Sequence, residues 1–209
     1  MRAATSRDWT RRVFLAACSA TALAASDDGF EPLFNGRDRS GWQGDPLLWL
    51  AEGDMLIGRS PGIAYNDFLA TERSYSDFIL RLQVHLVNNS GNSGVQFRSE
   101  RAPGSTEMIG YQADIGPGWW GSLYDESRRR KTLAGPAEEL VRKLVRADGW
   151  NDYEIEARGP RIRLKLNGTT TVDYEETDPG IPATGRIALQ VHSGPALEVR
   201  FRNIRLRTL

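Results

Sequence analysis

Three short segments of the chain alternate polar and apolar residues in a way that gathers reactive side chains. Val95–Arg98, Tyr111–Ile115 and Gln190–His192 each have a period of two, and side chains at i and i+2 of a strand share one face. If these strands are neighbours, one sheet face collects three amides, a guanidinium, a carboxylate and an imidazole. Such a set is suited to holding a polyhydroxylated ligand or to moving a proton. Its members are Gln96, Arg98, Gln112, Asp114, Gln190 and His192.

The same alternation has a simpler explanation, because strands of a sandwich usually pair a core face with a solvent face. We prefer that explanation for Arg81, Arg163, Lys165 and Arg200. The six residues named above differ in composition, since they are mostly short, hydrogen-bonding and uncharged. That mixture favours a concave and partly desolvated surface.

Strand signals also dominate the rest of the chain. Phe78–Leu86 and Tyr153–Ala157 alternate cleanly, and Ile162–Leu166 ends at Asn167-Gly168, a strong hairpin signal. Further strands are expected over residues 169–174, 187–192, 197–201 and 204–206. Residues 136–148 have helical spacing, and Pro136 at their start is suited to the first turn of a helix. The pattern predicts one all-β sandwich domain with one short helix.

The first 25 residues predict a leader segment that precedes the folded domain. Arg11 and Arg12 stand directly before an apolar run, Val13–Leu23, and small residues at 22–24 resemble a cleavage site. Paired arginines at this place are typical of a twin-arginine export signal, so we expect a periplasmic or secreted protein. Cys18, with the three residues before it, also resembles a lipoprotein cleavage box, and a lipid anchor is therefore an alternative.

Charge and cysteine content exclude several classes of function. Removing residues 1–25 takes away four arginines and one aspartate, which leaves 23 basic and 26 acidic residues and a net charge of −3. A nucleic-acid partner would require a basic surface, so none is expected. Cys18 is the single cysteine, so the mature chain would have no disulfide and no thiolate nucleophile or metal ligand. No further apolar stretch approaches the roughly 20 residues that cross a bilayer.

The chain also carries ordered motifs that resemble those of a known family. They are Leu33–Asp38 with Gly41-Trp42, Gly91–Val95, Gly110–Ile115, Gly121–Asp125, Trp150–Tyr153, Leu166–Gly168, Gly185–His192 and Phe201–Ile204. In this order they resemble the 3-keto-disaccharide hydrolase family over residues 29–209. The resemblance implies a concanavalin-like jelly roll of two sheets, in agreement with the strand pattern. Many members have Glu where this chain has Gln112, so a carboxylate base or metal ligand would be missing here.

The resemblance further implies chemistry on a glycoside already oxidised to a ketone at C3. A base removes the acidified C2 hydrogen, the enolate expels the group at C1, and water adds back. Such a site needs a base that titrates near the working pH and a stabiliser for the enolate. His192 is the candidate base, because an ordinary imidazole titrates closest to neutrality. Asp114 is its orienter, an alternative base or a metal ligand. Arg98 or a bound divalent cation would hold the enolate oxygen, although Arg98 could instead pair with Glu100 or Asp114.

Other residues are expected to contact the sugar without reacting. The three glutamines would supply amide hydrogen bonds, and the aromatic residues at 119 and 120, in a glycine-rich loop, suit sugar stacking. The alternative for both tryptophans is a cap over the sandwich edge. The expected substrate-binding set is Gln96, Gln112, Gln190, Tyr111, Trp119, Trp120, Tyr124, Asp125 and Glu126.

Two other functions fit the same fold, because fold alone does not determine function. One is a non-catalytic, lectin-like carbohydrate-binding module, which would need neither His192 nor Asp114. The other is an ordinary glycosidase that pairs Asp114 with Asp125 or Glu126, but no spaced pair of glutamates lies on one predicted strand. The joint presence of His192 and Asp114 favours an exported enzyme that cleaves 3-keto-glycosides.

Overall fold

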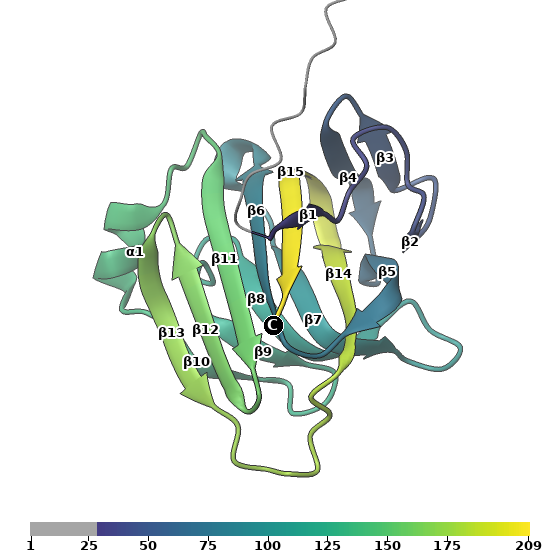
Figure 1. Ribbon diagram of the computed structural model, residues 1–209. Coiled ribbons are helices and arrows are strands. Elements are labelled where there is room, and N and C mark those ends of the chain that lie inside the picture. Colours follow the sequence, from purple (N-terminus) through teal and green to yellow (C-terminus); the bar gives the residue numbers. More distant parts are fainter. Residues whose placement is uncertain (1–28) are drawn as a thin grey trace, which may run out of the picture.

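Two antiparallel sheets packed face to face make up the described chain (Figure 1). The computed structural model describes residues 29–209, and the predicted leader over residues 1–25 lies outside this part. The first sheet has the order β13-β12-β11-β6-β15-β4-β3, with β1 paired to β15. The second sheet has the order β10-β9-β8-β7-β14-β5-β2. The prediction of an all-β two-sheet sandwich is therefore confirmed.

The strands are mostly short, and one helix flanks them. The first sheet contains β1 (Glu31–Pro32), β3 (Trp49–Glu52), β4 (Met55–Ile63), β6 (Phe78–Leu86), β11 (Asn151–Arg158), β12 (Arg161–Leu166), β13 (Thr169–Glu175) and β15 (Gly194–Thr208). The second contains β2 (Trp42–Gln43), β5 (Asp67–Tyr75), β7 (Ser93–Arg101), β8 (Met108–Ile115), β9 (Leu123–Glu126), β10 (Lys131–Ala134) and β14 (Gly185–Val191). The helix expected over residues 136–148 is observed as α1 (Glu138–Leu144), and η1 (Val87–Asn89) is a single 3₁₀ turn. Within residues 29–209, no helix is both long and apolar enough to span a bilayer.

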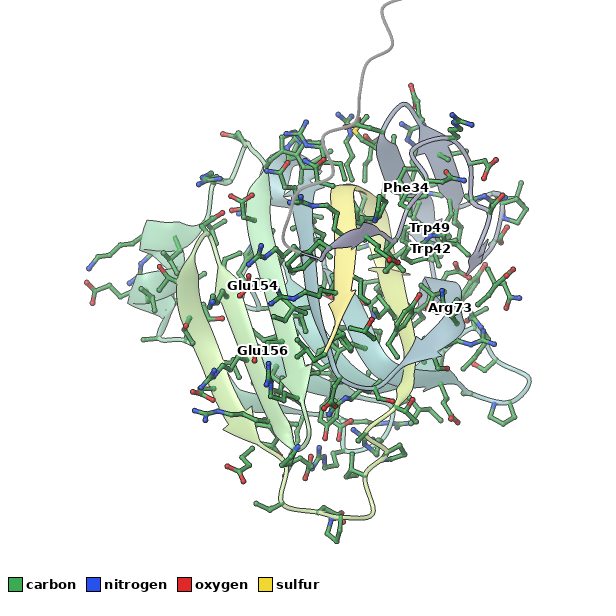
Figure 2. All side chains as sticks on the ribbon, viewed as in Figure 1. Phe34, Trp42, Trp49, Arg73, Glu154 and Glu156 are labelled. Atoms are coloured by element: carbon green, nitrogen blue, oxygen red, sulfur yellow. The ribbon has the colours of Figure 1, made fainter. Side chains whose placement is uncertain are left out.

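The core lies between the sheets and is built by strict alternation. In β6, Leu80, Leu82 and Val84 are buried in it, because every second residue of a strand faces the same side. The outward face of this sheet carries charged ladders, in which Arg81 and Lys165 each lie 2.7 Å from Glu154. Figure 2 shows Glu154 on this outward face, away from the other sheet. The charged residues of the first sheet therefore form a solvated surface, as expected.

A bulge in β7 breaks the alternation on which the site prediction depended. The register of β7 against β8 shifts between Phe97 and Glu100, and Arg98 has a left-handed φ of 46°. A Cβ atom at Gly185, on the neighbouring strand β14, would lie 2.4 Å from the Arg98 carbonyl carbon and the Ser99 nitrogen. The bulged backbone therefore requires a glycine beside it.

The bulge turns Arg98 away from the predicted site. Its guanidinium donates hydrogen bonds to the carbonyl oxygens of Ser76 (2.9 Å) and Gly159 (2.7 Å) and to Asp77 Oδ1 (2.8 Å). Ser76 and Asp77 connect β5 to β6, and Gly159 connects β11 to β12, so Arg98 ties the two sheets together at one end. The prediction that Arg98 shares a face with Asp114 is wrong, and its ionic partner is Asp77 rather than Glu100 or Asp114.

Candidate functional site

A pocket of about 200 Å³ opens on the face of the second sheet that points away from the core. Strands β8 and β9, the loop between them, and the residues just before β7 and just after β14 supply its walls. Tyr124 lies opposite Gln112 in the β8–β9 ladder, which brings two lining strands together. The lining residues are Asn92, Gln112, Asp114, Trp119, Tyr124, Glu126 and His192.

Asp114 is the most strongly perturbed acid of this pocket. Its side chain is buried, with 2 % of the residue exposed, and Oδ1 accepts a hydrogen bond of 2.7 Å from Gln112 Nε2. Burial raises the pKa of Asp114 to about 7, the Gln112 hydrogen bond opposes the shift, and the charge of Glu126 adds to it. A large share of Asp114 is therefore the neutral acid near pH 7.

His192 follows β14 directly and is oriented by the main chain. Its Nδ1 lies 2.6 Å from the carbonyl oxygen of Ser193, and a carbonyl oxygen can only accept a hydrogen bond. The proton of the neutral ring is therefore on Nδ1, which leaves a lone pair on Nε2. The backbone nitrogen of Ser193 donates to Asn66 Oδ1 over 2.9 Å, which fixes the orienting group. The carbonyl of Ser193, and not Asp114, thus orients His192.

The pocket is acidic. Burial raises the pKa of Glu126, nearby Glu107 raises it further, and His192 opposes the shift. Burial, followed by the charges of Glu126 and Asp114, raises the pKa of Tyr124. Tyr124 therefore keeps its hydroxyl proton and can serve as a hydrogen-bond donor near neutral pH.

The pocket is held against the first sheet by Tyr153 of β11. The hydroxyl of Tyr153 donates to the main-chain carbonyl oxygen of Asp114 (2.7 Å) and accepts from the backbone nitrogen of Gly121 (2.9 Å). Gly121 belongs to the loop between β8 and β9, which also carries Trp119. One buried side chain from the opposite sheet thus anchors both the strand and the loop that line the pocket.

Gln96 and Gln190 are buried side chains that do not line the pocket. Gln96 donates from Nε2 to Gln112 Oε1 over 3.0 Å and accepts from the Ser99 hydroxyl over 2.6 Å. Gln190 is fully buried, and neither atom of its amide has a hydrogen-bond partner within the described chain. Gln96 thus supports a lining residue, whereas Gln190 has no such role in this structure.

Three residues of the predicted substrate-binding set lie on the core side instead. Tyr111 stacks on Phe97 with 5.6 Å between ring centroids, and Trp120 is 2 % exposed. Asp125 is fully buried and forms ion pairs with Arg128 and Arg129. For the two strand residues the reason is alternation. Tyr111 is next to Gln112 in β8 and must face the opposite way. Asp125 lies between Tyr124 and Glu126 in β9 and must do the same.

Trp119 has the position expected for sugar stacking, whereas Trp120 has the position expected for a cap over the sandwich edge. Trp119 is 44 % exposed, lines the pocket and contacts Tyr124 edge to face, with 6.4 Å between centroids. Trp120 caps the sandwich edge, where its Nε1 donates to Asn89 Oδ1 over 2.9 Å.

Asn92 is a lining residue that sequence reasoning missed. It lies in a turn before β7, where alternation gives no signal, although it falls within the motif Gly91–Val95.

A metal ligand set is not evident in the described chain. Among residues 29–209, no group of three or more histidine, cysteine, aspartate and glutamate side chains is arranged to hold a metal ion. Gln112 lies beside Asp114 in this pocket, and its amide nitrogen is already directed at Asp114 Oδ1. We therefore derive no step through a metal ion.

Comparison with known proteins identifies the fold first. A predicted glycosyl hydrolase from Parabacteroides distasonis superposes with a TM-score of 0.66 at 18 % identity, over 87 % of this chain and 94 % of that one. The carbohydrate-binding module CBM66 from Bacillus subtilis gives 0.59 at 18 % identity, over 85 % and 100 %. A Bacillus licheniformis β-glucanase gives 0.59 at 14 % identity, over 86 % and 97 %. At these identities the likeness establishes the concanavalin-like fold alone.

The family follows from the sequence match. The model of the 3-keto-alpha-glucoside-1,2-lyase-like domain matches residues 29–207. The chain therefore belongs to this family, as the ordered motifs predicted. No protein in the curated set matches it.

Proposed function

We propose that the protein cleaves glycosides whose sugar has been oxidised to a ketone at C3. The observation that carries the proposal is the pairing of His192 and Asp114 in one pocket. His192 has its proton fixed on Nδ1 and so offers a basic Nε2, while burial raises the pKa of Asp114 to about 7 and keeps about half of it protonated near neutral pH. A base and an acid with different environments are what proton abstraction followed by elimination requires. Membership of the family supports the substrate class.

In this reaction His192 Nε2 takes the C2 proton, and the electron pair passes to the C3 oxygen as an enolate. Tyr124 and Asn92 are the pocket's hydrogen-bond donors for that oxygen, because the amide of Gln112 is directed at Asp114. The enolate then expels the C1 substituent, and Asp114 gives its proton to the leaving oxygen. Water adds at C1, His192 returns the proton to C2, and the remaining water proton restores Asp114. Arg98 has no part in these steps.

The test compares one disaccharide in two forms, unoxidised and oxidised at C3. Wild-type protein should cleave the oxidised form only, and His192→Ala should lower its turnover by roughly 10²–10⁴, the usual range for a lost general base. Exchange of the C2 hydrogen with deuterated solvent should be lost in the same variant. His85→Ala is the matched control, because His85 lies in β6 beside Trp150, with 5.7 Å between ring centroids, and not in the pocket.

Three results would contradict the proposal. They are equal cleavage of both sugars, full activity of His192→Ala, and an equal loss in His85→Ala. Binding of a sugar without turnover would favour the carbohydrate-binding alternative, in which the exposed ring of Trp119 stacks on the sugar.

A further inference from the structure

Three loops that are far apart in the sequence meet at the residue that orients His192. Asn66 precedes β5, Ser193 follows β14, and the tip of the β7–β8 hairpin (residues 102–107) lies against Asn66. None of these loop residues lines the pocket. Any effect that they have on the reaction must therefore pass through His192.

The side chain of Asn66 meets two opposite requirements. Its Oδ1 accepts a hydrogen bond from the backbone nitrogen of Ser193 over 2.9 Å, and its Nδ2 donates to Glu107 Oε2 over 3.3 Å. A backbone N–H can only donate and a carboxylate can only accept, so a primary amide suits both partners. Alanine would serve neither partner, and aspartate would place a second negative charge beside Glu107.

The hairpin tip holds Asn66 by its main chain as well. The Thr106 hydroxyl donates to the carbonyl oxygen of Asn66 over 2.7 Å. Arg101 donates to the carbonyl oxygens of Thr106 (2.7 Å) and Phe68 (2.9 Å), and Met108 packs with Phe68 in a small apolar cluster. The tip is therefore fixed to β5, the strand that begins directly after Asn66.

Ser193 presents two different groups to Nδ1 of His192. Its carbonyl oxygen lies 2.6 Å from Nδ1, and its hydroxyl oxygen lies 3.5 Å from the same atom. The carbonyl can only accept, so it keeps the ring proton on Nδ1, whereas a hydroxyl can also donate. Donation from the hydroxyl to Nδ1 would place the ring proton on Nε2. The position of the Ser193 main chain thus decides which nitrogen has the lone pair.

The segment between β4 and β5 holds that main chain on both sides. Asn66 binds the nitrogen of Ser193, and the next residue, Gly194, pairs with Ile63 at the end of β4. Gly194 has a left-handed φ of 130°, and a glycine restrains its neighbours little because it has no Cβ atom. Without the Asn66 bond, Ser193 would be held only through this glycine and could turn its hydroxyl toward Nδ1.

We propose that Asn66 is a positioning residue, which the hairpin tip holds in place and which keeps the ring proton of His192 on Nδ1. Its part in catalysis rests on the proposed function, in which the lone pair on Nε2 takes the C2 proton. The loop that joins β7 to β8 thereby acts on the reaction without contacting the sugar.

Nuclear magnetic resonance of protein labelled with ¹⁵N at histidine tests the proposal without any sugar. The sequence holds two histidines, so His85 is an internal reference for His192. At about pH 8.5, where an ordinary imidazole is neutral, wild-type His192 should show a protonated Nδ1 and an unprotonated Nε2. Asn66→Ala should transfer most of the proton population to Nε2 of His192 and leave the signals of His85 unchanged.

Asn35→Ala is the matched control for this loss of an amide. Asn35 Oδ1 also accepts hydrogen bonds from backbone nitrogens, those of Arg37 (2.8 Å) and Asp38 (3.0 Å), in a turn outside the pocket. This variant should leave the ring proton of His192 on Nδ1.

A second pair of variants tests the same contact if Asn66→Ala does not fold. Asn66→Asp alone places a carboxylate beside Glu107 and should lose part of the Nδ1-protonated population. Adding Glu107→Gln exchanges the donor and the acceptor of this contact, because the new amide can donate to the new carboxylate, whose other oxygen accepts from Ser193. The double variant should restore the wild-type signals of His192.

Activity separates this proposal from the proposed reaction. On the oxidised sugar, Asn66→Ala should lower kcat by up to roughly 10²-fold, as misplacement of a reacting group does, with KM little changed. A wild-type ring proton in Asn66→Ala, an equal change in Asn35→Ala, or a double variant that restores nothing would each overturn the role of Asn66. A moved ring proton with full turnover, or in a protein that cleaves neither sugar, would disprove the proposed reaction and leave the role of Asn66 standing.

Discussion

At the scale of single residues, Asp114 links the pocket to the pH dependence of stability. Its pKa is about 7 in the folded protein against an ordinary value of 3.8, so the folded state holds this proton more tightly than the unfolded chain. The stabilising contribution is complete below about pH 4 and is lost as the pH rises to about 7. Above that range the fold carries a buried carboxylate.

Replacing Asp114 by asparagine should remove this dependence while keeping the size of the side chain. As the pH rises from about 4 to 8, the wild-type free energy of unfolding should fall, relative to that of Asp114→Asn, by on the order of 2–4 kcal/mol. Urea unfolding of both proteins at the two pH values measures this difference. Parallel stability curves would show that Asp114 titrates alike in the folded and unfolded states. The same variant should lose turnover, because asparagine has no acidic proton to give.

The sequence predicts part of the candidate site at this scale. Gln112, Asp114 and His192 follow from alternation, and all three line the pocket. Alternation also assigns Tyr111 to the core side, so its inclusion in the expected substrate-binding set was wrong. Arg98 could not be predicted by counting, because a bulge is a backbone event that shifts the count by one residue.

At the scale of elements, that bulge depends on the small residue next to it in β14. Gly185→Ala would place a methyl group 2.4 Å from the bulged backbone of β7, and neither strand can move without breaking its ladder. We expect a loss of roughly 1–3 kcal/mol in the free energy of unfolding, the usual cost of overpacking. Gly149→Ala is the control, because the nearest atom to the new methyl group, Arg146 Cβ, would be 3.6 Å away. Equal stability of the two variants would show that β7 accommodates the methyl group.

Strand prediction succeeded where one face is buried and the other is solvated. The long alternating strand β6 has the predicted bounds, Phe78–Leu86. Strand β5 was missed because its first five residues, Asp67–Thr71, are all buried. Phe68 and Ala70 pack outward with Met108 and Ala188 in a second small apolar cluster. A strand covered on both faces has no period of two, and its sequence resembles a short buried segment of any kind.

At the scale of the whole molecule, the pocket depends on strand neighbours that are far apart in the sequence. His192 approaches Asp114 because β14 and β8 both flank β7 (Figure 1). Periodicity fixes the direction of each side chain but contains no information about which strands pair. The ordered motifs supplied that adjacency, through the fold that the family resemblance implies.

The cross-sheet anchor of Tyr153 has a consequence for hydrogen exchange. Loops beside binding sites usually open locally and exchange their amide protons quickly. The amide of Gly121 instead donates to the Tyr153 hydroxyl, which comes from the opposite sheet, over 2.9 Å, and more weakly to the Asp114 carbonyl oxygen over 3.3 Å, so its exchange requires both contacts to open. In deuterated solvent it should exchange as slowly as core amides of β8, and Tyr153→Phe should speed its exchange, because only the longer bond to Asp114 remains, while β8 stays protected. The floor of the pocket would then belong to the last part of the protein to unfold, and substrate entry would have to rely on side-chain motion at the rim.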